Sequence, residues 1–314
     1  MEVFPVVRSK KARTSNQTSI VKPVRRVAAL LGFLHKAEVD AIFKQQPFET
    51  RDRADPLELW RQYNAKIGTL QALVTKPAKP LPGSLSSLID EIKRRSTYKK
   101  YYEAVADYVF QLVPVDSLLA PQWYSDLDYV DELNCQLSKT MSLGDQLNFA
   151  MSEGRITEPI IIGNQVLFTS PRRNLSADQI PTVKELEGGE FEISIKAASR
   201  PNYIQVAVLN GRLFLTNGVH KVCALYKMGF TQVPCILRTV HSFEEMGIAR
   251  GSTSLFSPHI FEGPRPALVK DFLDPNVAVL LNMRSMYQIL QVTVSSGATT
   301  VPALPPERPS REQG

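Results

Sequence analysis

The stretch with the clearest chemical pattern lies at residues 217–221, where an expected strand ends and an expected helix begins. Gly218 allows the backbone to turn sharply, and the first backbone N–H groups of a helix have no intrahelical partner. The helix dipole adds partial positive charge there, so cationic side chains are unfavourable unless an anion lies beside them. This pattern predicts a phosphate site formed by Asn217, Gly218, Val219, His220 and Lys221. A solvated first turn without a ligand is the alternative.

His220 is also the candidate general acid or base, because histidine titrates near neutral pH. The sequence identifies no partner for its imidazole ring. The family resemblance described below implies that Asp116 and Glu158 are the carboxylates beside the site. Whether the chain is an enzyme is left open by these residues.

Three further carboxylates, Asp126, Asp128 and Asp131, are close enough in sequence to suggest the metal cluster of a nuclease. Their spacing favours the start of a helix instead. The three cysteines form no C-x-x-C pair and the four histidines lack metal-ligand spacing, so no metal site is expected.

The elements around residues 217–221 follow from short apolar runs. Asn210-Gly211 between two apolar runs predicts a hairpin of residues 203–209 and 212–216. A helix over 219–228, ended by Gly229, and a strand over 233–240 follow. Upstream we expect strands at 109–113, 160–162 (buried) and 166–168, helices at 129–139 and 143–152, and an irregular insertion at 170–190.

Residues 211–237 resemble the ParB/sulfiredoxin superfamily, in which a strand leads into a G-x-[HR]-R signature that opens a helix. Gly218-Val219-His220-Lys221 stands at the signature, Ala224 at the small position after it, and Val233-Pro234 at the closing strand. Residues 112–118 and 155–162 resemble the opening elements of the family. The resemblance implies a small mixed sheet with helices, an α/β (α+β) fold, over about 105–245.

The resemblance also implies that the cofactor, if there is one, is a nucleoside triphosphate with Mg²⁺, and that no other cofactor is needed. It further implies a bacterial or phage protein. Val219 stands where sulfiredoxins have their catalytic cysteine, so sulfiredoxin activity is not expected. His220-Lys221 replaces the arginine pair of ParB proteins, and Cys223 stands at the third arginine. Lysine lacks the bidentate fork of arginine, so nucleotide affinity is expected to be weaker. Whether the chain has a weak NTPase or nuclease-like activity is left open.

The N-terminal part of the chain is basic, with 20 Lys and Arg against 9 Asp and Glu in residues 1–100. We expect a disordered tail over 1–25 and a helical region over 26–104, with helices at 26–46, 56–74 and 84–95 and a Pro-rich linker at 76–83. Basic residues interleaved with tyrosines suggest contact with DNA or RNA. The candidate contacts are Lys10, Lys11, Arg13, Arg25, Arg26, Lys93, Arg94 and Arg95.

The remaining regions are a C-terminal extension over 246–296 and a second disordered tail over 297–314. Apolar runs far shorter than about 20 residues exclude a membrane span, and a cytoplasmic protein is expected. Two functions stay open. One is a ParB-like nucleotide-binding module that acts with nucleic acid. The other is a non-enzymatic interaction or assembly protein, with a protein partner or a second copy contacted through Phe48, Trp60 and Tyr63.

Overall fold

The computed structural model describes residues 24–46, 48, 55–103, 108–153, 158–170, 175–177, 180–188, 190–246 and 255–295. The chain divides into two compact units, each assembled from segments distant in sequence. Unit 1 comprises residues 1–152 and 202–285, and unit 2 comprises residues 153–201 and 286–314. The mixed α/β class expected from the sequence is confirmed. Most of the expected N-terminal tail and the whole C-terminal tail lie outside the described residues.

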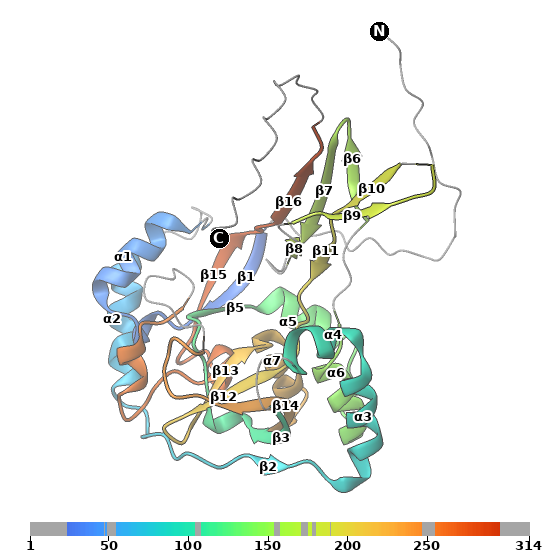
Figure 1. Ribbon diagram of the computed structural model, residues 1–314. Coiled ribbons are helices and arrows are strands. Elements are labelled where there is room, and N and C mark those ends of the chain that lie inside the picture. The colour runs from blue at the N-terminus through green and yellow to red at the C-terminus, as the bar shows by residue number, and fades with distance from the viewer. Residues whose placement is uncertain are drawn as a thin grey trace, which may run out of the picture. The chain divides into compact units, whose positions relative to one another are not determined.

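Unit 1 is built on a six-stranded sheet with the strand order β2-β3-β14-β12-β13-β4 (Figure 1). Its strands are β2 (Lys79–Pro80), β3 (Val109–Pro114), β4 (Leu118–Leu119), β12 (Gln205–Leu209), β13 (Arg212–Asn217) and β14 (Gln232–Thr239). β12 and β13 form the expected hairpin, with positive φ at Asn210 and Gly211. Because β12 lies between β13 and β14 in the sheet, the chain crosses over it through α7 (Val219–Lys227), the helix that carries the predicted phosphate site, and β14 lies parallel to β12.

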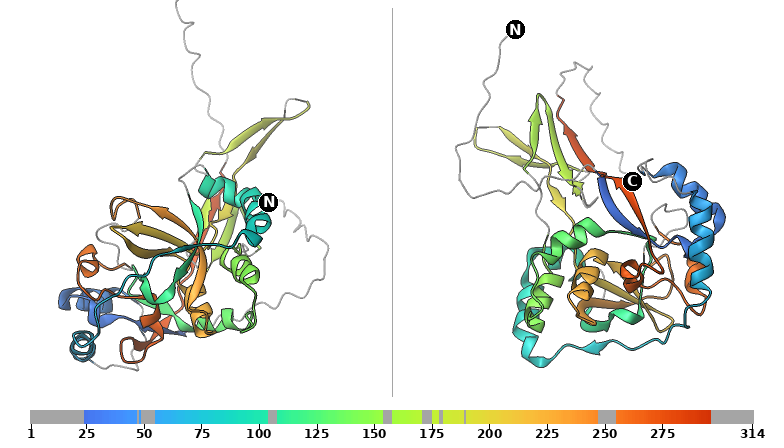
Figure 2. Two further views of the ribbon diagram at one scale, coloured as in Figure 1. Left: turned by 90° about the horizontal axis from the view of Figure 1, so that it is seen from below. Right: turned by 180° about the vertical axis from the view of Figure 1, so that it is seen from behind.

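The other helices of unit 1 lie around this sheet, with α1 and α2 on one side and α3 and α6 on the opposite side (Figures 1 and 2). They are α1 (Lys36–Gln45), α2 (Pro56–Ile67), α3 (Ser86–Arg94), α4 (Ser96–Tyr98), α5 (Leu127–Asn134) and α6 (Leu143–Ala150). Short helical turns are η1 (Leu31–Phe33), η3 (Gly83–Leu85), η4 (Lys99–Glu103), η5 (Val115–Ser117), η6 (Pro258–Phe261) and η7 (Val269–Leu273). Asp55 caps α2 with Pro56 in its first turn, as expected.

The helix expected over residues 26–46 is wrong in its first half. Residues Val24–Ala29 form β1, the middle strand of a three-stranded antiparallel sheet with the order β15-β1-β5. Its neighbours are β15 (Val279–Arg284) and β5 (Tyr124–Asp126). Consecutive residues 27–31 are all buried, so both faces of this segment are covered. A short apolar run of this kind fits a buried strand and a helix equally well, and contacts distant in sequence decide between them.

The core of unit 1 accounts for the aromatic residues expected as partner contacts. Phe48, Trp60 and Tyr63 are half-buried against the core, and Trp60 Nε1 donates a hydrogen bond of 2.8 Å to the Leu34 carbonyl. These three side chains therefore stabilise unit 1 itself. The largest fully buried side chains of the core are Trp123, Tyr203, Phe214, Phe256 and Phe272.

The described elements of unit 2 are all strands. β16 (Gln288–Thr293), β7 (Gln165–Ser170) and β6 (Ile160–Ile162) form an antiparallel sheet with β7 in the middle. β9 (Thr182–Glu185) pairs with β10 (Phe191–Ser194), and β8 (Leu175–Ala177) pairs with β11 (Ala197–Ser199). Two expectations are corrected: residues 175–177 and 182–185 form strands within the supposed irregular insertion, and the isoleucines of β6 are exposed rather than buried.

Candidate functional site

The start of α7 has the backbone geometry that the sequence predicts. Gly218 precedes the helix with φ of 90°, and a Cβ atom there would lie 2.9 Å from the Ile204 Cα atom. The site therefore requires glycine, both for its left-handed backbone and for the close approach of Ile204. Asn217 Oδ1 accepts a hydrogen bond of 2.9 Å from the Gly218 N–H, which fixes the turn.

His220 contacts the chain rather than pointing into open solvent. Its Nε2 atom accepts a hydrogen bond of 3.1 Å from the backbone N–H of Asp126, and its ring meets the Tyr129 ring edge-on at 5.2 Å. Only a neutral imidazole can accept a hydrogen bond at Nε2, which places the ring proton on Nδ1. In this arrangement His220 supplies no positive charge for a phosphate group.

Lys221 is buried, with 3% of the residue exposed. Its Nζ atom donates hydrogen bonds to the carbonyls of Ala150 (3.2 Å) and Ser152 (3.0 Å), at the C-terminal end of α6. The last carbonyls of a helix have no intrahelical partner and carry partial negative charge. The ammonium group therefore joins the first turn of α7 to the end of α6. Lys221 and His220 are thus brought together with Gly218 as expected, but each binds backbone of its own chain.

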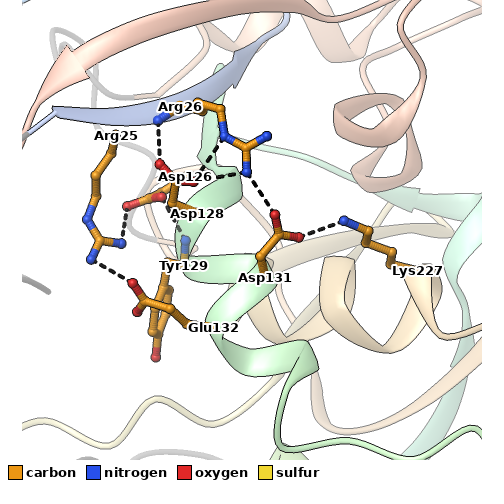
Figure 3. A network of polar contacts seen from close by, with 8 residues as sticks. All are labelled: Arg25, Arg26, Asp126, Asp128, Tyr129, Asp131, Glu132 and Lys227. Atoms are coloured by element: carbon orange, nitrogen blue, oxygen red, sulfur yellow. Dashed lines mark hydrogen bonds and ion pairs between the residues drawn. The ribbon is translucent and has the colours of Figure 1, made fainter. Parts of the chain in front are cut away.

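Arg25, a candidate nucleic-acid contact, is bound to carboxylates around α5 (Figure 3). Its guanidinium group lies 3.1 Å from Asp126 Oδ2 and 3.0 Å from Glu132 Oε1. Asp126 also caps α5, because its Oδ1 atom accepts from the Tyr129 N–H. Burial raises the pKa of Asp126 above its usual value, and the cap and Arg25 only partly offset this effect.

Arg26 belongs to the same network (Figure 3). Its Nη2 atom lies 2.9 Å from Asp128 and 2.8 Å from Asp131, and Lys227 Nζ approaches Asp131 at 2.6 Å. The pKa of Asp131 lies below its usual value. Partial burial raises this pKa, but the combined effect of Lys227 and Arg26, which lower it, is larger. The three aspartates therefore start α5 and bind β1, which confirms the helix-start interpretation. The charges of Arg25 and Arg26 are balanced locally.

The other candidate nucleic-acid contacts are separate from this network. Lys93 and Arg94 are exposed at the end of α3, whereas Arg95 donates to the Met151 carbonyl at 3.1 Å. Lys10, Lys11 and Arg13 lie outside the described residues. Of the two expected carboxylates, Asp116 pairs with Lys76 at 2.5 Å, and Glu158 is exposed in unit 2.

Two of the three cysteines are buried, and the third is exposed. Cys223 and Cys235 are buried, and burial raises the pKa of Cys223 to about 12 and that of Cys235 further. Cys135 is exposed. A search of the described part of the chain finds no group of three or more His, Cys, Asp or Glu residues placed to hold a metal ion.

Unit 2 carries a surface that the sequence analysis missed. Leu175 and Pro201 are the buried apolar side chains among its described residues. Among the part of unit 2 that the structure describes, thirteen large hydrophobic side chains are exposed: Ile160, Ile161, Ile162, Ile180, Val183, Leu186, Phe191, Ile193, Ile195, Met286, Tyr287, Ile289 and Val294. The alternation of apolar and polar residues over 191–195 could have revealed part of this surface, because a strand with that pattern has one apolar face.

Comparison of the chain with protein-family models, curated proteins and solved structures finds no match. In the described parts of the chain, no helix has the length and apolar character needed to cross a lipid bilayer.

Proposed function

We propose that this protein is a non-enzymatic interaction protein, which binds another polypeptide chain through the exposed apolar strands of unit 2. The observation that carries the proposal is the burial pattern of unit 2, where exposed hydrophobic side chains far outnumber buried ones. Ile161 is 72% exposed and Ile193 is 68% exposed. In soluble proteins, large hydrophobic side chains exposed in this number are typical of an interaction site. Strands without a hydrophobic core of their own need a partner for stability.

The start of α7 supports the same proposal. A phosphate group would have to replace the carbonyls that Lys221 binds and would gain no charge from a neutral His220. We infer that these two residues hold α7 against α6 and β5. Nucleotide binding at Asn217–Lys221 stays a prediction, and it is the rival that the experiment must separate from the proposal.

We also propose that unit 1 has a ParB/sulfiredoxin-like fold that has lost the family's chemistry. The support is the order of elements around the signature: the hairpin β12–β13, Gly218 in left-handed conformation, α7, and then β14 parallel to β12. β3 pairs antiparallel with β14, where the family's opening strand is expected. A scaffold of this kind positions surfaces for binding without catalysing a reaction.

The experiment combines light scattering and thermal unfolding. The purified chain has a monomer mass of 35.1 kDa. We expect the wild-type mass to rise with concentration, and the double variant Ile161→Thr/Phe191→Ser to stay at the monomer mass with an unchanged unfolding midpoint. Nucleoside di- and triphosphates, with and without Mg²⁺, should leave the midpoint of the wild type where it is, because a ligand that binds only the native state raises it.

The matched control is Ser194→Ala, which changes the opposite face of β10 and should leave the mass unaffected. The proposal is wrong if the wild type is monomeric at every concentration and a nucleotide raises its midpoint in a way that Lys221→Met abolishes. That result would assign the function to the start of α7.

A further inference from the structure

The hairpin β9–β10 has two faces of opposite character. Directly paired residues of antiparallel strands lie on the same face, so Val183 and Ile193 share one face with Phe191. Their exposed fractions are 59%, 68% and 62%. The opposite face holds polar and charged pairs, with Lys184 directly across from Glu192. The apolar face is therefore formed by Val183, Phe191 and Ile193, and Glu185, which pairs with Phe191, lies on it next to the tip.

The tip of the hairpin is strongly acidic. Residues 185–192 contain four glutamates and no Lys or Arg, and all four glutamates are exposed. The tip is closed by the hydrogen bond from the Leu186 N–H to the Glu190 carbonyl, at 2.8 Å. A segment that binds this hairpin must therefore combine apolar residues with a cluster of positive charge.

The chain contains a segment with that chemistry at its N-terminus. Val3, Phe4, Val6 and Val7 are followed at once by Arg8, Lys10, Lys11 and Arg13. The apolar half matches the apolar face of the hairpin, and the basic half matches the acidic tip. Opposite charges of this kind orient a segment and exclude wrong partners.

We propose that residues 1–13 of a second copy of this chain bind the apolar face and acidic tip of the β9–β10 hairpin. The inference rests on the proposed interaction function and names its partner. Two copies of the same hairpin would bring eight glutamates together and repel each other. Each copy supplies one segment and one hairpin, so the contact is head-to-tail and joins copies into chains or rings.

The test is a complementation experiment, in which two variants of the chain are mixed and their masses are measured by light scattering. The first variant lacks residues 1–13 and keeps the hairpin. The second is Phe191→Ser/Ile193→Ser and keeps the N-terminal segment. Each variant alone should be monomeric, whereas an equimolar mixture should form a 1:1 heterodimer. Because the contact is partly ionic, raising NaCl from 50 to 500 mM should weaken the heterodimer by about tenfold.

A charge swap gives an independent control for folding. Glu187→Lys/Glu190→Lys should prevent self-association, and Lys10→Glu/Lys11→Glu in the mixing partner should restore it.

Unchanged association after deletion of residues 1–13, with loss after Phe191→Ser/Ile193→Ser, overturns this inference while the interaction function stands. Unchanged association in both variants overturns both proposals. A wild type that is monomeric only while residues 1–13 are present would show binding within one copy and overturn the second-copy assignment. If deletion of residues 1–13 abolishes binding to a DNA oligonucleotide but leaves the association between copies unchanged, the segment binds nucleic acid and the inference is overturned as well.

Discussion

Replacing Lys221 by methionine separates a structural role from a ligand-binding role by the sign of one number. Methionine keeps most of the apolar stem and removes the ammonium group. If the ammonium stabilises the joint between α7 and α6, the free energy of unfolding of the nucleotide-free protein falls. If the charge is instead held ready for an absent phosphate, its removal relieves the cost of burying a cation, and the free energy of unfolding rises.

The size of the loss follows from the two carbonyls. A hydrogen bond to a charged group contributes about 1.5–3 kcal/mol. The Ala150 carbonyl retains the hydrogen bond from the Ile204 N–H at 3.1 Å, and Ser152 is exposed, so water can replace the ammonium there. The net loss should therefore be about 1–2 kcal/mol. For a unit of this size, that corresponds to a fall in the unfolding midpoint of about 3–6 °C.

The assay is urea unfolding of nucleotide-free protein, followed by tryptophan fluorescence and circular dichroism. Lys227→Met is the matched control: it removes an exposed lysine of the same helix, whose ion pair with Asp131 is worth less than about 1 kcal/mol. A more stable Lys221→Met variant would refute the structural role of Lys221 and favour the phosphate site.

Three further outcomes follow from the geometry. Gly218→Ala should lower the free energy of unfolding by about 2–4 kcal/mol, measured by urea unfolding, because of the positive φ and the 2.9 Å approach of backbone; a loss below about 1 kcal/mol would contradict the close contact. In native protein at pH 8, a thiol reagent should modify Cys135 within minutes, whereas Cys223 and Cys235 should react only after unfolding. Mass spectrometry identifies the modified residues, and equally fast modification of Cys223 or Cys235 in native protein would contradict the prediction. Asp131→Asn should lower stability at pH 7 by about 0.5–1 kcal/mol. The pKa of Asp131 is lowered by folding, so this difference is fully present above the ordinary aspartate pKa and should disappear as the pH falls through the lowered value, in pH-dependent urea unfolding.

Local pattern was sufficient for several elements of the fold. The hairpin β12–β13, α7 and β14 were predictable because Asn210-Gly211 and Gly218 require positive φ, and a few residues around them determine the turn. The cap of α2 by Asp55 is equally local. The same cannot be said of β1, whose apolar run fits a helix as well as a strand and becomes a strand by pairing with residues about 100 and 250 positions away.

The sequence by itself determined the mixed α/β class, the sharp entry into α7 and the group Asn217–Lys221 at its start, because each depends on neighbouring residues. Only the tertiary structure decided what those side chains bind. Lys221 meets carbonyls about 70 residues earlier in the chain, and His220 meets a backbone N–H about 90 residues earlier. The exposure of unit 2 is likewise a tertiary property: Ile160–Ile162 has the composition of a buried strand, and only the absence of covering elements among the described residues leaves these side chains exposed. Burial and partner choice depend on which distant segments meet, and no local pattern specifies that.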